Sequence, residues 1–174
     1  MSLKTSNCVS VAIITISMTT SIASAQAPSI GGHIGFLLPL VTTNQPGGTT
    51  TLADNFTIGF PTGITVKGSG RTAFDMEFVP LIQDSPRDVT LTFHPGLLWS
   101  IGHGYSVGMR AAFVVNSSQV GFTPLLHKSW SIEGAKGLFK AYFVEADLPV
   151  RFDRPANGPA SDPVTFAMHF GVGF

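Results

Sequence analysis

The stretch VTFAMHFGVGF, Val164 to Phe174, decides how this chain is interpreted. Every second residue in it is large and apolar, whereas the residues between them are small or polar. A period of two places the apolar set on one face of an extended strand. The stretch therefore predicts a strand with one apolar face, made of Val164, Phe166, Met168, Phe170, Val172 and Phe174.

This terminal stripe resembles the C-terminal assembly signal of bacterial outer-membrane β-barrels. The wider pattern, over residues 26–174, resembles the outer-membrane protein A and outer-membrane protein W types of eight-stranded barrel. The resemblance implies a chain surrounded by outer-membrane lipid, with its last strand engaging the barrel-assembly machinery. It does not choose among the roles of such barrels, which include envelope stabilisation, adhesion, carriage of small hydrophobic molecules and modification of lipid A.

The N-terminus has the organisation of an export signal. Lys4 supplies positive charge, Val9 to Met18 form a short apolar core, and Ala23-Ser24-Ala25 is a small-residue cleavage site. We therefore expect a signal peptide over residues 1–25 and a mature barrel domain over residues 26–174. The only cysteine, Cys8, lies in this peptide, so the mature chain has no disulfide framework. The alternative interpretation of the segment is a helical membrane anchor.

The composition is unusual for a soluble domain. Only 11% of the residues are charged, compared with about 25% in a typical soluble protein. The ten Lys and Arg residues balance the ten Asp and Glu residues, so no basic surface suggests a nucleic-acid partner. Low charge suits a protein with a lipid-facing exterior, although it also suits a β-protein with few surface charges.

Alternating segments separated by turn residues recur along the chain and predict eight antiparallel strands. Most of the predicted strands are long enough for a tilted transmembrane strand, which needs about 9–11 residues. We expect short turns at 68–70 and 102–104 on the periplasmic side, and longer outer loops at 44–51 and 153–162. The predicted strands are 33–43, 52–67, 71–83, 88–100, 104–115, 118–130, 137–152 and 163–174.

Aromatic residues gather near the predicted strand ends. Tyrosine and tryptophan favour the headgroup layer of a membrane because one edge of the ring is apolar and the other can form hydrogen bonds. The sequence places Trp99, Tyr105, Trp130 and Phe174 near one end of the strands, and Phe78, Phe113 and Phe152 toward the other. The alternative is that these rings form the core of a soluble β-sandwich.

If the apolar faces meet lipid, the opposite faces fill the interior. An eight-stranded barrel leaves room there for side chains or for one small ligand, and buried charges must be paired. We expect a hydrogen-bonded ionic plug with Arg110 at its centre, because a guanidinium can serve two carboxylates. The residues predicted for this plug are Asp75, Glu77, His94, Arg110, Glu145, Asp147, Arg151 and His169.

The histidines on the inward faces are His33, His94, His127 and His169. None of them shows a close ligand spacing, and only His94 and His169 fall at a common height, on opposite sides of the predicted barrel. We therefore expect hydrogen-bonded interior histidines and no metal or cofactor.

Prolines conflict with a regular barrel, because proline donates no ladder hydrogen bond. Pro39, Pro61, Pro95 and Pro124 fall inside predicted strands, and Pro80 and Pro149 near strand ends. Bulged strands, misplaced boundaries or a lateral opening for a hydrophobic ligand would each account for them.

Three functions remain open from the sequence. The first is a non-enzymatic integral barrel of the outer membrane with a plugged polar interior. It would have a structural or interaction role in the cell envelope, with the binding or passage of a small hydrophobic molecule as an open option. The second is a secreted soluble β-barrel or sandwich that binds a ligand. The third, an enzyme that modifies lipid A, is disfavoured because no histidine lies in a predicted outer loop and no catalytic residues are expected.

Overall fold

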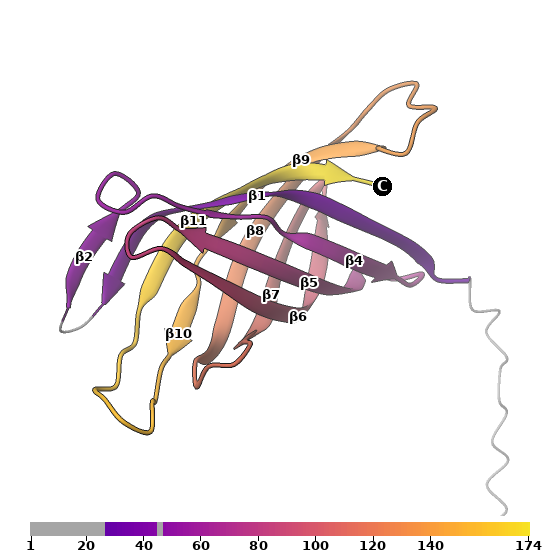
Figure 1. Ribbon diagram of the computed structural model, residues 1–174. Coiled ribbons are helices and arrows are strands. Elements are labelled where there is room, and N and C mark those ends of the chain that lie inside the picture. Colours follow the sequence, from indigo (N-terminus) through magenta and orange to yellow (C-terminus); the bar gives the residue numbers. More distant parts are fainter. Residues whose placement is uncertain (1–26, 45–46) are drawn as a thin grey trace, which may run out of the picture.

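The computed structural model describes residues 27–44 and 47–174 (Figure 1). The predicted signal peptide, residues 1–25, lies outside this part of the chain. Among the described residues there is no helix of a length and apolarity that would span a bilayer. The strands are β1 (Ser29–Asn44), β2 (Gly48–Thr51), β3 (Thr57–Gly59), β4 (Thr62–Lys67), β5 (Thr72–Gln83), β6 (Asp88–Gly102), β7 (Tyr105–Val114), β8 (Val120–Ser131), β9 (Ala141–Asp147), β10 (Val150–Phe152) and β11 (Val164–Gly173).

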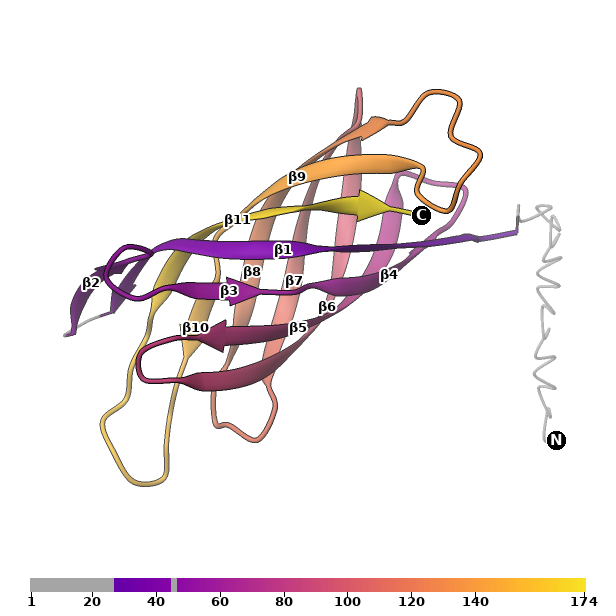
Figure 2. The same cartoon turned by 45° about the horizontal axis from the view of Figure 1, so that its top comes forward.

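All strand pairings are antiparallel, and the sheet closes because β11 pairs with β1. β3 and β4 continue one another in a single register against β5, and β9 and β10 do the same against β8. Each of these two pairs therefore occupies one position, and eight strand positions form a closed ring (Figure 2). The prediction of an all-β antiparallel chain is confirmed.

Prolines mark the irregularities of the ring. Pro61 lies in the break between β3 and β4, and Pro149 lies in the break between β9 and β10. Pro39 borders a one-residue shift in the pairing of β1 with β11. Pro95 lies where the ladder between β6 and β7 is interrupted, from Phe93 to Gly96. These four prolines therefore coincide with local breaks and a bulge, while the pairing around the ring continues on both sides of each. Pro80 and Pro124 lie within continuous ladders, of β5 with β6 and of β7 with β8.

Two predicted strands were too long. Residues 52–56 form a turn instead of the start of a strand, because the Asp54 carboxylate accepts hydrogen bonds from the Thr51 hydroxyl at 2.7 Å and the Thr51 N–H at 2.8 Å. These two bonds, the hydroxyl first, lower the pKa of Asp54. Residues 48–51, predicted as loop, form β2 and extend the end of β1 as a hairpin. Residues 137–140 precede β9 instead of belonging to it.

The ring has two distinct ends. The one that we call the terminal end carries Phe174, the turns at 68–71 and 102–104, and the connection 132–140. The loop end carries the β2 hairpin and the connections 84–87, 115–119 and 153–163 (Figures 1 and 2). We expected only short turns at the terminal end and longer loops at the other. The long connection 132–140 lies at the terminal end, so this expectation holds only in part.

The apolar residues of β11 lie on the outer face of the ring, opposite the buried His169 and Ala167. Val164, Phe166 and Phe174 are exposed, and Met168, Phe170 and Val172 are partly exposed. The backbone of Phe174 exchanges two hydrogen bonds with Gly32, at 2.9 and 3.0 Å. Its ring lies over Gly32, where a Cβ atom would come within 2.6 Å of the ring. The glycine thus leaves space for the final aromatic residue at the point of closure.

Candidate ionic cluster and cavity

The ring interior is occupied mainly by polar and charged side chains. All eight residues predicted for the interior lie on inward faces, and all except Arg151 are buried. They come from β5, β6, β7, β9, β10 and β11, so the ring gathers residues that are up to 94 positions apart in the sequence, from Asp75 to His169. We call them, together with His33 and His127, the ionic cluster.

Arg110 lies at the centre of the ionic cluster. Its Nε donates to Asp75 at 2.8 Å, and its Nη1 donates to Glu145 at 2.5 Å. The same Nη1 lies 3.7 Å from Glu77 and 3.9 Å from Asp147. Asp75 also accepts a hydrogen bond from the Thr65 hydroxyl at 2.6 Å. One guanidinium, only 2% exposed, therefore faces four carboxylates.

Glu77 is a second centre of hydrogen bonding. His33 Nε2 lies 2.9 Å from one carboxylate oxygen, and His94 Nδ1 lies 3.3 Å from the other. Arg151 donates to His94 Nε2 at 2.9 Å, so this nitrogen carries no proton. His94 is therefore neutral, with its proton on Nδ1 and directed at Glu77. Arg151 is further held by Thr123 Oγ1 at 3.1 Å.

The strand register explains which histidines meet the carboxylates. Glu145 pairs directly with His127 on one side and with His169 on the other. His127 Nδ1 donates to Glu145 at 3.1 Å. His33 and His127 were not predicted for the plug, because heights counted along single strands leave out the stagger between neighbouring strands in a closed ring. Both histidines were predicted to face inward, and this direction was the sequence signal that could have placed them in the plug.

The expectation that every interior histidine is hydrogen-bonded is wrong for His169. This ring is fully buried, yet neither nitrogen has a hydrogen-bond partner, and neither carboxylate oxygen of Asp147 has one. His169 Nδ1 lies 3.5 Å from Glu145 and 3.7 Å from Glu77. His94 and His169 were expected on opposite sides of the interior. Instead, both lie close to Glu77, at 3.3 and 3.7 Å from its carboxylate.

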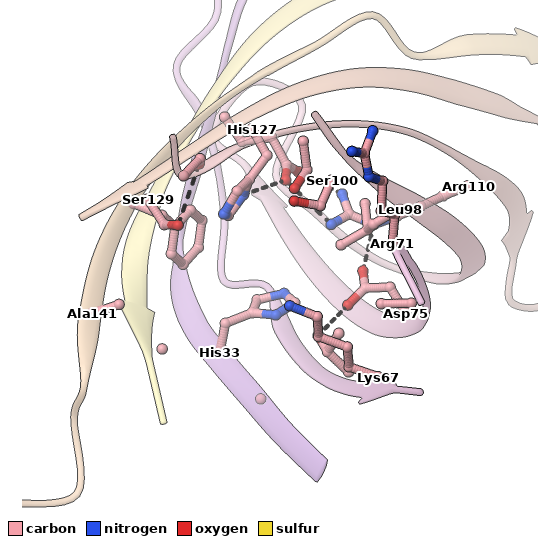
Figure 3. A pocket seen from close by; sticks show the side chains of 18 residues that line it. His33, Lys67, Arg71, Asp75, Leu98, Ser100, Arg110, His127, Ser129 and Ala141 are labelled. Atoms are coloured by element: carbon pink, nitrogen blue, oxygen red, sulfur yellow. Dashed lines mark hydrogen bonds and ion pairs between the residues drawn. The ribbon is translucent and has the colours of Figure 1, made fainter. Parts of the chain in front are cut away.

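A cavity of about 450 Å³ opens between the ionic cluster and the terminal end of the ring (Figure 3). Five members of the ionic cluster line it, namely His33, Asp75, Arg110, His127 and Glu145. Toward the terminal end, its wall includes the cationic side chains of Lys67 and Arg71 and the hydroxyls of Ser100, Ser106 and Ser129. Leu98 and Phe143 add apolar surface to the wall. The volume falls within the range of small-molecule sites, and the lining offers both polar and apolar contacts.

Two inward-facing glycines make room for the histidines. A Cβ atom at Gly63 would come within 2.6 Å of His33 Nε2, and one at Gly35 within 2.8 Å of His169 Nε2. Distances below 3.0 Å force a shift of the neighbour. The glycines on β1 and β4 therefore set where these imidazoles lie.

Gly63→Ala is expected to displace His33 from Glu77 and to lower the free energy of unfolding by about 1–3 kcal/mol, the usual cost of overpacking. Gly68→Ala is the matched control, because a Cβ atom there would meet nothing within 4 Å. Urea titration of both variants measures the difference. Equal stability of the two variants would show that His33 adapts without cost.

The chemistry of the cluster is that of charge pairing. Glu145 and His127 form a carboxylate–histidine pair such as hydrolases use, but within the described residues no serine hydroxyl hydrogen-bonds to His127. Arg110 is fully engaged by carboxylates.

Comparison with models of protein families, with curated proteins and with solved structures finds no match for this chain.

Proposed function

We propose that this chain is an integral β-barrel of the bacterial outer membrane, closed inside by the ionic cluster, with a non-enzymatic structural or interaction role in the cell envelope. The observation that carries the proposal is the inverted distribution of polarity. Among the described residues, ten polar or charged residues are buried, compared with seven hydrophobic ones. Thirty-three large hydrophobic residues are exposed. A soluble protein rarely exposes so many large apolar side chains while it buries charged ones.

Aromatic residues on the outer face support a membrane-facing exterior. Trp99, Tyr105, Trp130 and Tyr142 are all exposed near the terminal end. Trp130 stacks on Tyr142 with ring centroids 5.2 Å apart, and the Lys128 ammonium lies 4.2 Å from the centre of the Tyr105 ring. Tyrosine, tryptophan and lysine together are typical of the headgroup layer. Phenylalanines form an outer band on neighbouring strands, including Phe78, Phe93 and Phe113.

The strand lengths and the filled interior support a closed barrel instead of a pore. β5, β6 and β8 have 12, 15 and 12 residues, and a tilted transmembrane strand needs about 9–11. An aqueous channel requires about 16–18 strands, whereas here eight positions surround a cluster of paired charges. The resemblance to outer-membrane proteins A and W agrees with this proposal.

The cavity at the terminal end favours a second role, the binding of a small molecule. Its lining combines charged and hydroxyl-bearing side chains with apolar ones, among them Leu98 and Phe143, so it suits a small ligand that has both polar and apolar parts. In the proposed orientation the cavity faces the periplasm, and the ionic cluster separates it from the loop end. A secreted soluble binder remains the competing proposal.

Fractionation of cells that express the full-length chain tests the proposal. We expect recovery in the outer membrane and, in mild detergent, a gel mobility that changes when the sample is boiled, because a closed barrel resists unfolding in cold detergent. Recovery in the soluble fraction with a single mobility would reject the membrane barrel and favour the secreted binder. Outer-membrane recovery without the shift would reject the closed barrel.

A further inference from the structure

Two buried side chains in the ionic cluster lack the partners that buried polar groups require. Asp147 is 2% exposed and His169 is 0% exposed, and no hydrogen bond reaches either carboxylate oxygen or either imidazole nitrogen. Their neighbours Glu77 and Glu145 each accept hydrogen bonds from two residues. Buried polar groups without partners are rare and costly. Asp147 and His169 are therefore the residues at which the interior is incomplete.

The charges of the ionic cluster are also out of balance. With all four carboxyl groups ionised, Asp75, Glu77, Glu145 and Asp147 would carry four negative charges against the two positive charges of Arg110 and Arg151, which leaves two negative charges when the histidines are neutral. His94 is held neutral by the hydrogen bond from Arg151. Buried excess charge of this kind requires either a cation or added protons. A single divalent cation would neutralise it.

The unpartnered groups lie at a spacing suited to such a cation. Asp147 and Glu145 are two residues apart on β9 and so face the same side, and His169 pairs with Glu145 across the β9–β11 ladder. One ligand atom from each of the three lies within 4.8 Å of the others. Carboxylate oxygen and imidazole nitrogen are the ligands of divalent first-row transition metals, zinc among them. We propose that Asp147, Glu145 and His169 hold one divalent transition-metal ion.

Neighbouring residues favour this trio over a second one nearby. His33, Glu77 and His169 also bring ligand atoms within 4.8 Å of one another. In that second trio only His169 is without a hydrogen-bond partner, because His33 and Glu77 bind each other at 2.9 Å. In the proposed trio both Asp147 and His169 are without partners, and only Glu145 is already engaged, by Arg110 and His127. Phe143 packs edge-on against His169, with centroids 4.9 Å apart, and restricts the orientation of the imidazole. Glu145 also lines the cavity, so the trio adjoins the cavity through this carboxylate.

Metal binding to the purified full chain tests the site, whether or not the outer face meets lipid. After treatment with a chelator, the protein is equilibrated with Zn²⁺ and its metal content is measured by mass spectrometry. We expect one equivalent of Zn²⁺ per chain, and an absorption spectrum with visible bands when Co²⁺ replaces Zn²⁺. Asp147→Asn and His169→Gln should each weaken binding by at least about tenfold, since each removes a direct ligand.

His103→Asn is the matched control, because His103 lies exposed in the turn between β6 and β7, away from the cluster. It should bind Zn²⁺ as the unaltered chain does. Failure of the unaltered, folded chain to bind Zn²⁺ would overturn the proposal and assign the missing charge to protons, and this measurement does not depend on whether the variants fold. Loss of binding in His103→Asn would place the ion on the surface, and full retention of binding in both cluster variants would place it outside the proposed trio. Either result would overturn the proposal.

Discussion

Replacing Arg110 with methionine is expected to lower the free energy of unfolding by about 3–5 kcal/mol, the usual cost of removing one partner of a buried ion pair. The guanidinium is 2% exposed and bonds Asp75 at 2.8 Å and Glu145 at 2.5 Å. Methionine fills similar space but leaves both carboxylates without their cation. Urea titration in detergent, followed by the fluorescence of the two tryptophans, measures the loss.

The control for this variant is Arg87→Met. Arg87 lies in the connection between β5 and β6, and its side chain is 84% exposed, with Asp84 at 3.6 Å. Exposed pairs contribute about 0–1 kcal/mol, so this variant should unfold close to the unaltered chain. Adding Asp75→Asn and Glu145→Gln to Arg110→Met should restore part of the stability, because the uncompensated charges are then removed. An Arg110→Met variant as stable as the control would refute the central role of Arg110.

Placing a lysine on the outer face at Met109 is expected to lower stability in lipid by about 2–4 kcal/mol, the cost of a cation at the centre of a bilayer. Met109 is 53% exposed and lies next to Arg110 on β7, near the middle of the strand. A lysine at an equally exposed position in water would cost almost nothing. The measurement is a urea titration of the protein refolded into lipid vesicles.

Leu138→Lys is the control for the lipid-facing substitution. Leu138 is 68% exposed in the connection between β8 and β9, outside the proposed membrane-spanning strands. This variant should change the free energy of unfolding by no more than about 0.5 kcal/mol. If Met109→Lys behaves like Leu138→Lys, the outer face meets water, and the proposal of a membrane barrel is wrong.

The sequence was sufficient for the coarse architecture because alternation is a local property. Each long segment shows on its own which side chains share a face, so the inward direction of Glu77, Arg110 and Glu145 could be predicted without any knowledge of strand pairing. The turn at Asp54 could not be predicted in this way. The hydrogen bonds that its carboxylate accepts from Thr51 compete with strand formation, and the alternation of apolar and polar residues does not reveal them.

Contacts within the ionic cluster depend on the register between strands. His33 meets Glu77 because both residues pair with Gly63, one from β1 and one from β5. His127 meets Glu145 because the two residues pair directly between β8 and β9. Such pairings are fixed only when the ring closes, so strand-by-strand counting placed these two histidines too far away. The lack of partners at Asp147 and His169 likewise follows only from the packed interior.

The two proline breaks make the ring unequal along its axis. Near the loop end, β3 pairs with β1 only through Leu37 and Gly59, because β1 beyond this point pairs with β2 instead. The opposite seam, between β10 and β11, is continued by backbone hydrogen bonds from Thr165 to Pro149 and from Arg151 to Pro163. The side of β1 that faces β3 is therefore the less firmly held of the two seams, and local opening is expected there at a lower free energy than global unfolding.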